Sequence, residues 1–107
     1  MSKSREQFCH LNRVHLHIYR DSHQRCVAKE IRINGVSLRP YQLGRMVDID
    51  TANAPPQGCG NRVFIPNKSF IYSKSTKEML GFNDEDAKDL ETLLIEVMSI
   101  GRCQQCR

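Results

Sequence analysis

The sequence has no tryptophan, and only 7% of its 107 residues are aromatic. It also has no hydrophobic run that approaches the roughly 18 apolar residues needed for a membrane-spanning helix. The N-terminal stretch MSKSREQFCH starts with charge but has no apolar segment behind it, which argues against a secretory signal peptide. We therefore expect a cytoplasmic protein that has no membrane partner and whose thiols are reduced.

Repeats and catalytic signatures are absent as well. Gly58-Cys59-Gly60 is too short to cradle a phosphate, and no lysine-serine pair follows it. His15 and His17 have no carboxylate at a spacing useful for acid–base catalysis, and Cys59 has no evident base to activate it. The length is that of about one domain. These features exclude a multidomain enzyme and lead us to expect no enzymatic activity.

The apolar content is sufficient for a small core. Leu, Ile, Val and Phe make up about 24% of the chain, above the roughly 20% below which chains tend to stay disordered. A chain this short buries a smaller share of its surface than a large domain does. We expect a loosely ordered N-terminal segment over residues 1–12, a single domain over 13–101, and a C-terminal Cys-x-x-Cys tail over 102–107.

Apolar and polar residues alternate cleanly through residues 13–20, which is typical of a half-buried strand. The two faces are Val14, Leu16 and Ile18 on one side, and His15, His17 and Tyr19 on the other. Residues 21–24 have the composition of a turn, and the strand pattern resumes over 26–33. Two neighbouring strands of one sheet are therefore expected here.

Asn34-Gly35 is a strong hairpin signal, because both positions of a type I′ turn need positive φ. A two-residue turn there puts four apolar residues on one face. The expected pairs are Ile33 with Val36 and Ile31 with Leu38, and on the other face Arg32 with Ser37 and Glu30 with Arg39. Pro40 should end the return strand.

The middle of the chain is less regular. Residues 43–50 read as another strand, and 62–65 and 69–73 as two strand pieces interrupted at Pro66-Asn67. The intervening segment is rich in proline and glycine and is expected to be a loop.

The C-terminal third changes to a helical period. Ser75-Thr76-Lys77-Glu78 has the pattern of a capping box that opens a short helix, which Gly81 can close. Asn83 can cap a second helix over about 84–100. Its apolar stripe consists of Ala87, Leu90, Leu93, Leu94, Val97 and Ile100. The sequence thus predicts an α+β fold: a small antiparallel meander of four to five strands with a C-terminal amphipathic helix on one face.

Positive charge is concentrated in the first half of the chain. Residues 1–45 hold nine Lys or Arg against three Asp or Glu, within a net charge of +4. A basic strand face next to a proline-rich loop can contact an acidic protein surface or a polyanion. The candidate partner-binding residues are Arg13, His15, His17, Tyr19, Arg32, Arg39, Pro55 and Pro56.

The cysteines suggest one candidate metal site. Cys103 and Cys106 have the spacing of two zinc ligands, and His23 and Cys26 have matching spacing, with Cys59 as a further candidate. The alternative is that all five cysteines are ordinary thiols, since an odd number does not suit a fully paired disulfide framework. Apart from this structural zinc, no cofactor is expected.

Two functions fit these observations. The first is a non-enzymatic binding protein that docks on a larger protein and modulates or inhibits it, as a host-directed modulator from a mobile element such as a phage would. The alternative is a small nucleic-acid-binding protein that uses the basic strand face, with or without the zinc site. The two differ in salt dependence, because phosphate contacts release counterions.

Overall fold

A computed structural model describes residues 5–20, 28–50 and 61–99. It contains two small sheets and four helices in these ranges. The strands are β1 (Arg5–Leu11), β2 (Val14–Arg20), β3 (Ala28–Ile33), β4 (Val36–Leu38), β5 (Gly44–Asp50) and β6 (Asn61–Pro66). The helices are α1 (Pro40–Leu43), α2 (Lys68–Ile71), α3 (Lys74–Leu80) and α4 (Asp84–Met98).

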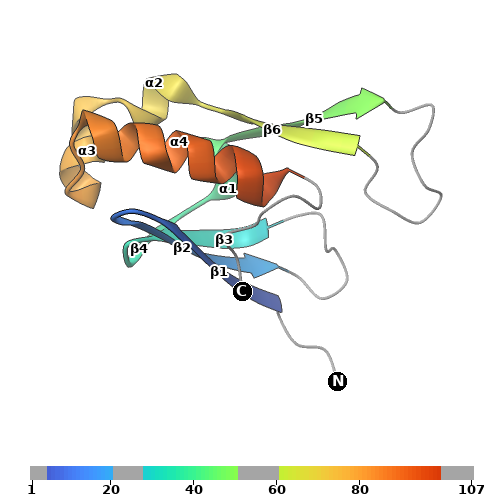
Figure 1. The fold of residues 1–107 in the computed structure, drawn as a ribbon, viewed down its shortest axis with the longest axis horizontal. Coiled ribbons are helices and arrows are strands. Elements are labelled where there is room, and N and C mark those ends of the chain that lie inside the picture. The colour runs from blue at the N-terminus through green and yellow to red at the C-terminus, as the bar shows by residue number, and fades with distance from the viewer. Residues whose placement is uncertain (1–4, 21–27, 51–60, 100–107) are drawn as a thin grey trace.

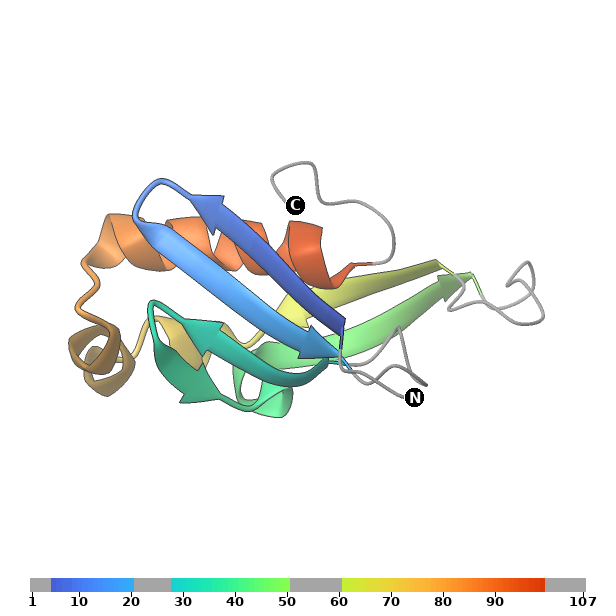
Figure 2. The ribbon, with the colours of Figure 1, turned by 90° about the horizontal axis from the view of Figure 1, so that it is seen from below.

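The strands form an antiparallel sheet in the order β1-β2-β3-β4 and a separate antiparallel hairpin, β5-β6. Helix α4 packs against β1 and β2 of the sheet and against β6 of the hairpin (Figure 1). Figure 2 shows α4 and the hairpin side by side behind the four-stranded sheet. The predicted α+β class, with a four-stranded meander and a C-terminal helix packed on it, is confirmed. The hairpin is a second sheet and does not extend the meander.

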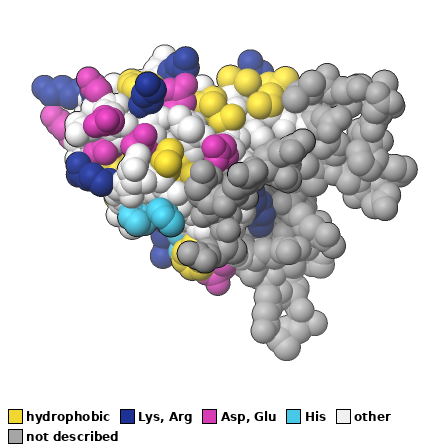
Figure 3. Space-filling model, in the orientation of Figure 1, with side chains coloured by type: hydrophobic (Ala, Val, Ile, Leu, Met, Phe, Trp, Pro, Cys, Tyr) yellow, Lys and Arg dark blue, Asp and Glu magenta, His cyan; other side chains and the backbone are white. Residues whose placement is uncertain are grey.

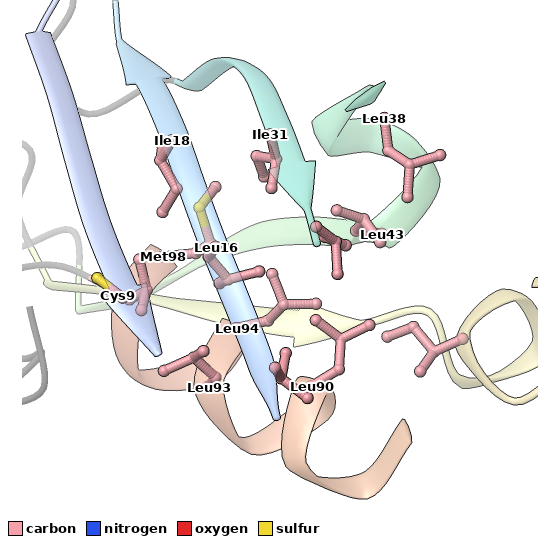
Figure 4. Packing of buried hydrophobic residues seen from close by; sticks show 14 of the residues in the cluster. Cys9, Leu16, Ile18, Ile31, Leu38, Leu43, Leu90, Leu93, Leu94 and Met98 are labelled. Atoms are coloured by element: carbon pink, nitrogen blue, oxygen red, sulfur yellow. The ribbon is translucent and has the colours of Figure 1, made fainter. Parts of the chain in front are cut away.

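The core lies between the four-stranded sheet and the layer of α4 and the hairpin (Figure 4). Strand β2 contributes Val14, Leu16 and Ile18, all buried, as its alternation predicts. Helix α4 contributes five buried residues of the predicted stripe, and Met98 as well. The five stripe residues are Ala87, Leu90, Leu93, Leu94 and Val97. Burial of these side chains is the main stabilising contribution to the fold.

The Asn34-Gly35 hairpin forms as predicted. Asn34 and Gly35 have φ angles of 49° and 87°, and the pairs Ile33–Val36, Ile31–Leu38 and Arg32–Ser37 form in the expected register. Strand β4 ends at Leu38 and Pro40 begins α1, so the proline stops the strand. The predicted pairing of Glu30 with Arg39 in the ladder is wrong, because the strand ends one residue earlier. Glu30 instead accepts hydrogen bonds from Arg32 and Ser37.

Helix α4 begins at the predicted cap. The Asn83 side chain accepts a 2.8 Å hydrogen bond from the Asp86 N–H, and the Asp86 carboxylate accepts one from the Asn83 N–H. The first turn carries three acids, which the helix dipole favours. The described helix ends at Met98, and Ser99 is its C-cap.

The expectation of a loosely ordered segment over residues 1–12 is wrong for residues 5–11, which form β1. This strand pairs with all of β2 across a two-residue turn at Asn12-Arg13. The turn is tied to α4 by a 3.0 Å hydrogen bond from Asn12 to Asp89 and a 3.3 Å ion pair between Arg13 and Asp86. Contact with the helix holds the edge strand in place, and those helix residues are distant in the sequence.

The strand predicted over 69–73 is also wrong. Residues 68–71 form α2, because the Asn67 side chain accepts a hydrogen bond from the Phe70 N–H and caps a helical turn. Helix α3 begins at Lys74, and its N-cap is Ser73 rather than the predicted Ser75. Gly81 closes α3 with φ 70°, as predicted.

The short helices are joined to α4 at Tyr72. Its hydroxyl donates a 2.7 Å hydrogen bond to Glu91, and this carboxylate raises the pKa of Tyr72 to about 12. Lys68 lies 3.5 Å from the same carboxylate. These contacts tie α2 and the Tyr72 that follows it to Glu91 in the middle of α4.

Several predictions lie outside the described residues. They concern the turn at 21–24, the loop after β5, the end of the last helix at residues 100 and 101, and the tail over 102–107.

Replacing Leu94 tests the packing of α4. Leu94 is fully buried, so Leu94→Ala should lower the free energy of unfolding by about 2–5 kcal/mol. Thr92→Ala, at an exposed position of the same helix, should change it by less than about 0.5 kcal/mol. Chemical denaturation measures both. Equal effects of the two substitutions would show that α4 does not pack as described.

Candidate functional site

The candidate site is the outer face of the four-stranded sheet, opposite α4. Figure 2 looks onto this face, and none of the described segments passes in front of β1 and β2. The outward residues of β1, β2 and β3 are largely polar or aromatic. They are Glu6, Phe8, His10, His15, His17, Tyr19, Glu30 and Arg32.

Four of these side chains form a continuous row, which we call the aromatic row: Phe8, His17, Tyr19 and Arg32. Phe8 stacks on His17 with ring centroids 3.9 Å apart, and His17 lies 4.1 Å from the Tyr19 ring. The Arg32 guanidinium lies over Tyr19, 5.2 Å from its centroid, in a cation–π contact. The row crosses three strands, because Phe8 is opposite His17 and His17 is opposite Arg32 in the ladders.

Carboxylates accompany the row. A Glu6 oxygen lies 2.7 Å from Nε2 of His17. Glu30 accepts hydrogen bonds from the Ser37 hydroxyl and, at 3.2 Å, from Nε of Arg32. The Ser37 bond, then the Arg32 bond and the nearby positive charges of Arg32 and Arg39, hold the pKa of Glu30 below its usual range. Glu30 is thus kept ionised beside the aromatic row.

The face is less basic than the sequence suggests. Arg32 and Arg39 lie close to Glu30, and Glu6 adds a second carboxylate, so these described charges balance when the histidines are neutral. Arg13 was expected beside His15 and His17. It lies in the β1–β2 turn instead and pairs with Asp86 of α4, which packs on the opposite side of the sheet. The predicted basic strand face therefore carries two carboxylates beside its arginines.

The structure brings together four of the predicted partner-binding residues, His15, His17, Tyr19 and Arg32, on one face. The backbone of His15 is fixed by Asn34, whose side-chain oxygen accepts a 2.7 Å hydrogen bond from the His15 N–H. Arg39 is exposed at the N-cap of α1, near Glu30. Pro55 and Pro56 lie outside the described residues.

Three residues of the site were missed by sequence reasoning: Glu6, Phe8 and His10. All three belong to β1, which was not expected to be a strand. A signal was present, since Glu6, Phe8 and His10 alternate with Gln7, Cys9 and Leu11. The alternation is hard to recognise because an apolar residue, Phe8, is on the outer face.

The predicted zinc ligands Cys103, Cys106, His23 and Cys26, and the further candidate Cys59, lie outside the described residues. Within the described ranges no three His, Cys, Asp or Glu side chains are grouped closely enough to hold a metal ion. Cys9, buried on the inner face of β1, is disulfide-bonded. The expectation of reduced thiols is therefore wrong for this residue.

A cavity of about 210 Å³ opens beside the β5–β6 hairpin. Apolar and aromatic side chains, including Tyr41, Met46, Phe64 and Met98, form most of its wall, and the described charged groups that line it are Arg45 and Arg62. Gly44 at its edge lies against the Phe64 ring, and a Cβ at this position would come within 2.5 Å of that ring. The described wall thus combines apolar surface with positive charge and contains no carboxylate.

The chain matches no protein-family model, no curated protein and no solved structure. None of the described helices is long and apolar enough to cross a membrane.

The hydrogen bond from Ser37 is expected to be the main cause of the lowered pKa of Glu30. Ser37→Ala should raise the pKa of Glu30 toward its usual value, because the strongest lowering interaction is removed. The side-chain carboxyl signal in an NMR pH titration measures this. Ser69→Ala, in α2, should leave the pKa unchanged. If Ser37→Ala also leaves it unchanged, Ser37 does not bond to Glu30.

Proposed function

We propose that the protein is a non-enzymatic binding protein that docks on a larger protein through the outer face of its four-stranded sheet and modulates or inhibits it. The observation that carries this proposal is the exposure of Phe8. This apolar ring is 52% exposed, yet it is held in place by stacking on His17 at the start of the aromatic row. The sequence alone is also compatible with a host-directed modulator carried by a mobile element.

The composition of the row supports a protein partner. Aromatic residues and arginine are enriched at protein–protein interfaces and among the residues that dominate binding energy. Phe8, His17 and Tyr19 are positioned by β-ladders and by contact with one another. A surface held in this way loses little side-chain entropy on binding. The proposed partner presents an apolar patch that covers Phe8, with polar groups at its edge toward the exposed Arg32 and Arg39.

The alternative is binding of single-stranded nucleic acid. Rings on a sheet can stack on bases, and Arg32 could contact a phosphate. Glu6 and Glu30 oppose this function, because both carboxylates lie beside the rings and would repel a phosphate backbone. The balance of charge on the face therefore favours a protein partner.

We propose the cytoplasm as the site of action, as expected from the sequence. The disulfide at Cys9 opposes this assignment, because disulfides are rare in that compartment.

Phe8→Ala tests the docking face. In co-purification from native lysate after nuclease treatment, wild-type chain should retain one protein at fixed stoichiometry. Phe8→Ala should weaken that complex by about 30-fold or more, as expected for a dominant interface residue worth at least about 2 kcal/mol. Met79→Ala is the matched control, because Met79 is exposed to a similar degree, 46%, but lies on α3. It should retain the partner with unchanged affinity.

Unfolding midpoints of both variants separate lost binding from lost stability. Equal retention by wild type and Phe8→Ala would contradict docking through this face. Bound material that is removed by nuclease, with affinity for an oligothymidine probe that falls steeply with salt, would favour the nucleic-acid function instead.

A further inference from the structure

Two histidines outside the aromatic row face each other across the first two strands. His10 of β1 is directly opposite His15 of β2, next to the Asn12-Arg13 turn. Their ring centroids lie 5.7 Å apart, the planes are inclined by 21°, and both residues are exposed. Figure 3 shows histidine side chains grouped at the edge of the molecule where β1 and β2 lie.

This separation suits two imidazoles on one metal ion. A metal-bound imidazole nitrogen lies about 2.0–2.1 Å from the ion, so the ring centre lies about 3.2 Å from it. Two rings on one ion then have centres about 4.5 Å apart at a right angle and about 5–6 Å apart at tetrahedral or somewhat wider angles. The rings of His10 and His15 are stacked with nearly parallel planes. Because an imidazole nitrogen binds a metal in the plane of its ring, both rings must turn for their nitrogens to meet at one ion. Rotation about the soft terminal torsion of each exposed ring makes the nitrogens converge with no backbone movement.

The backbone beneath the two rings is already fixed. The adjoining turn is tied to α4 through Asn12–Asp89 and Arg13–Asp86, and the N–H of His15 is bonded to Asn34. His17, the nearest other histidine on β2, is occupied by Glu6 and by the rings of the aromatic row. The two imidazoles therefore lie side by side on a fixed stretch of backbone.

We propose that His10 and His15 form a two-histidine site for a divalent ion of the late first-row transition metals. Imidazole suits Ni²⁺, Cu²⁺ and Zn²⁺, whereas Mg²⁺ and Ca²⁺ require oxygen ligands. Since no three potential ligands gather among the described side chains, water completes the coordination sphere and the ion exchanges with solvent. This site is separate from the predicted cysteine-based zinc site, and it does not depend on the docking function.

Ni²⁺ alone is the probe, applied to the full, untagged chain, because it is paramagnetic and does not oxidise thiols. Substoichiometric Ni²⁺ should broaden the ring-proton NMR signals of His10 and His15 before other signals. Mg²⁺ should have no effect. In His10→Ala, broadening of His15 should require at least tenfold more Ni²⁺, and His15→Ala should have the same effect on His10. The control Thr92→Ala, at an exposed position of α4, should behave as wild type.

Metal binding should also join β1 to β2 and raise the unfolding temperature. Saturating Ni²⁺ should therefore stabilise wild type and Thr92→Ala but not His10→Ala. Binding should weaken as the pH falls, because protons compete for the imidazoles. An unchanged amide spectrum shows that each variant is folded. If His10→Ala is not folded, His10→Gln replaces it. Broadening of His15 that persists in His10→Ala, or broadening that spares both histidines in wild type, would overturn the proposal.

Discussion

Burial of one face of β2 is the constraint on which the rest of the structure depends. Val14, Leu16 and Ile18 lie in the core beneath α4, and because strand side chains alternate, His15 and His17 must face outward with Tyr19. A shift of the pairing register by one residue would bury the imidazoles and expose the apolar set. Packing against α4 thus fixes both the fold and the surface on the opposite side.

The parts of the fold that could be predicted from sequence have clean local periodicity or turn chemistry. The alternation in β2, the positive φ at Asn34-Gly35, and the capped apolar stripe of α4 each specify one structure. Strand β1 could not be recognised with the same ease, because its stability comes from pairing with β2 and from ties to α4. Nothing local shows that β5 and β6 pair apart from the meander, because strand partners are set by tertiary packing.

The same local patterns decided which residues of the candidate site could be predicted. His15, His17, Tyr19 and Arg32 followed from the alternation of β2 and the register of the Asn34-Gly35 hairpin. Phe8, which makes the row apolar at one end, was missed together with its strand. Charge was the least predictable property, because it depends on partners distant in sequence: Arg13 is directed to Asp86 of α4 and not to the outer face.

The inner face of β2 packs in the core, and we propose that its outer face binds the partner protein. Titration of the isotope-labelled chain with the protein retained in co-purification, followed by backbone amide NMR, tests it most directly. We expect the backbone signals of β1 and β2 around the aromatic row to shift or broaden first, while those of α3 and the β5–β6 hairpin stay in place. Changes centred on α3 or on the hairpin, with β1 and β2 unaffected, would contradict it.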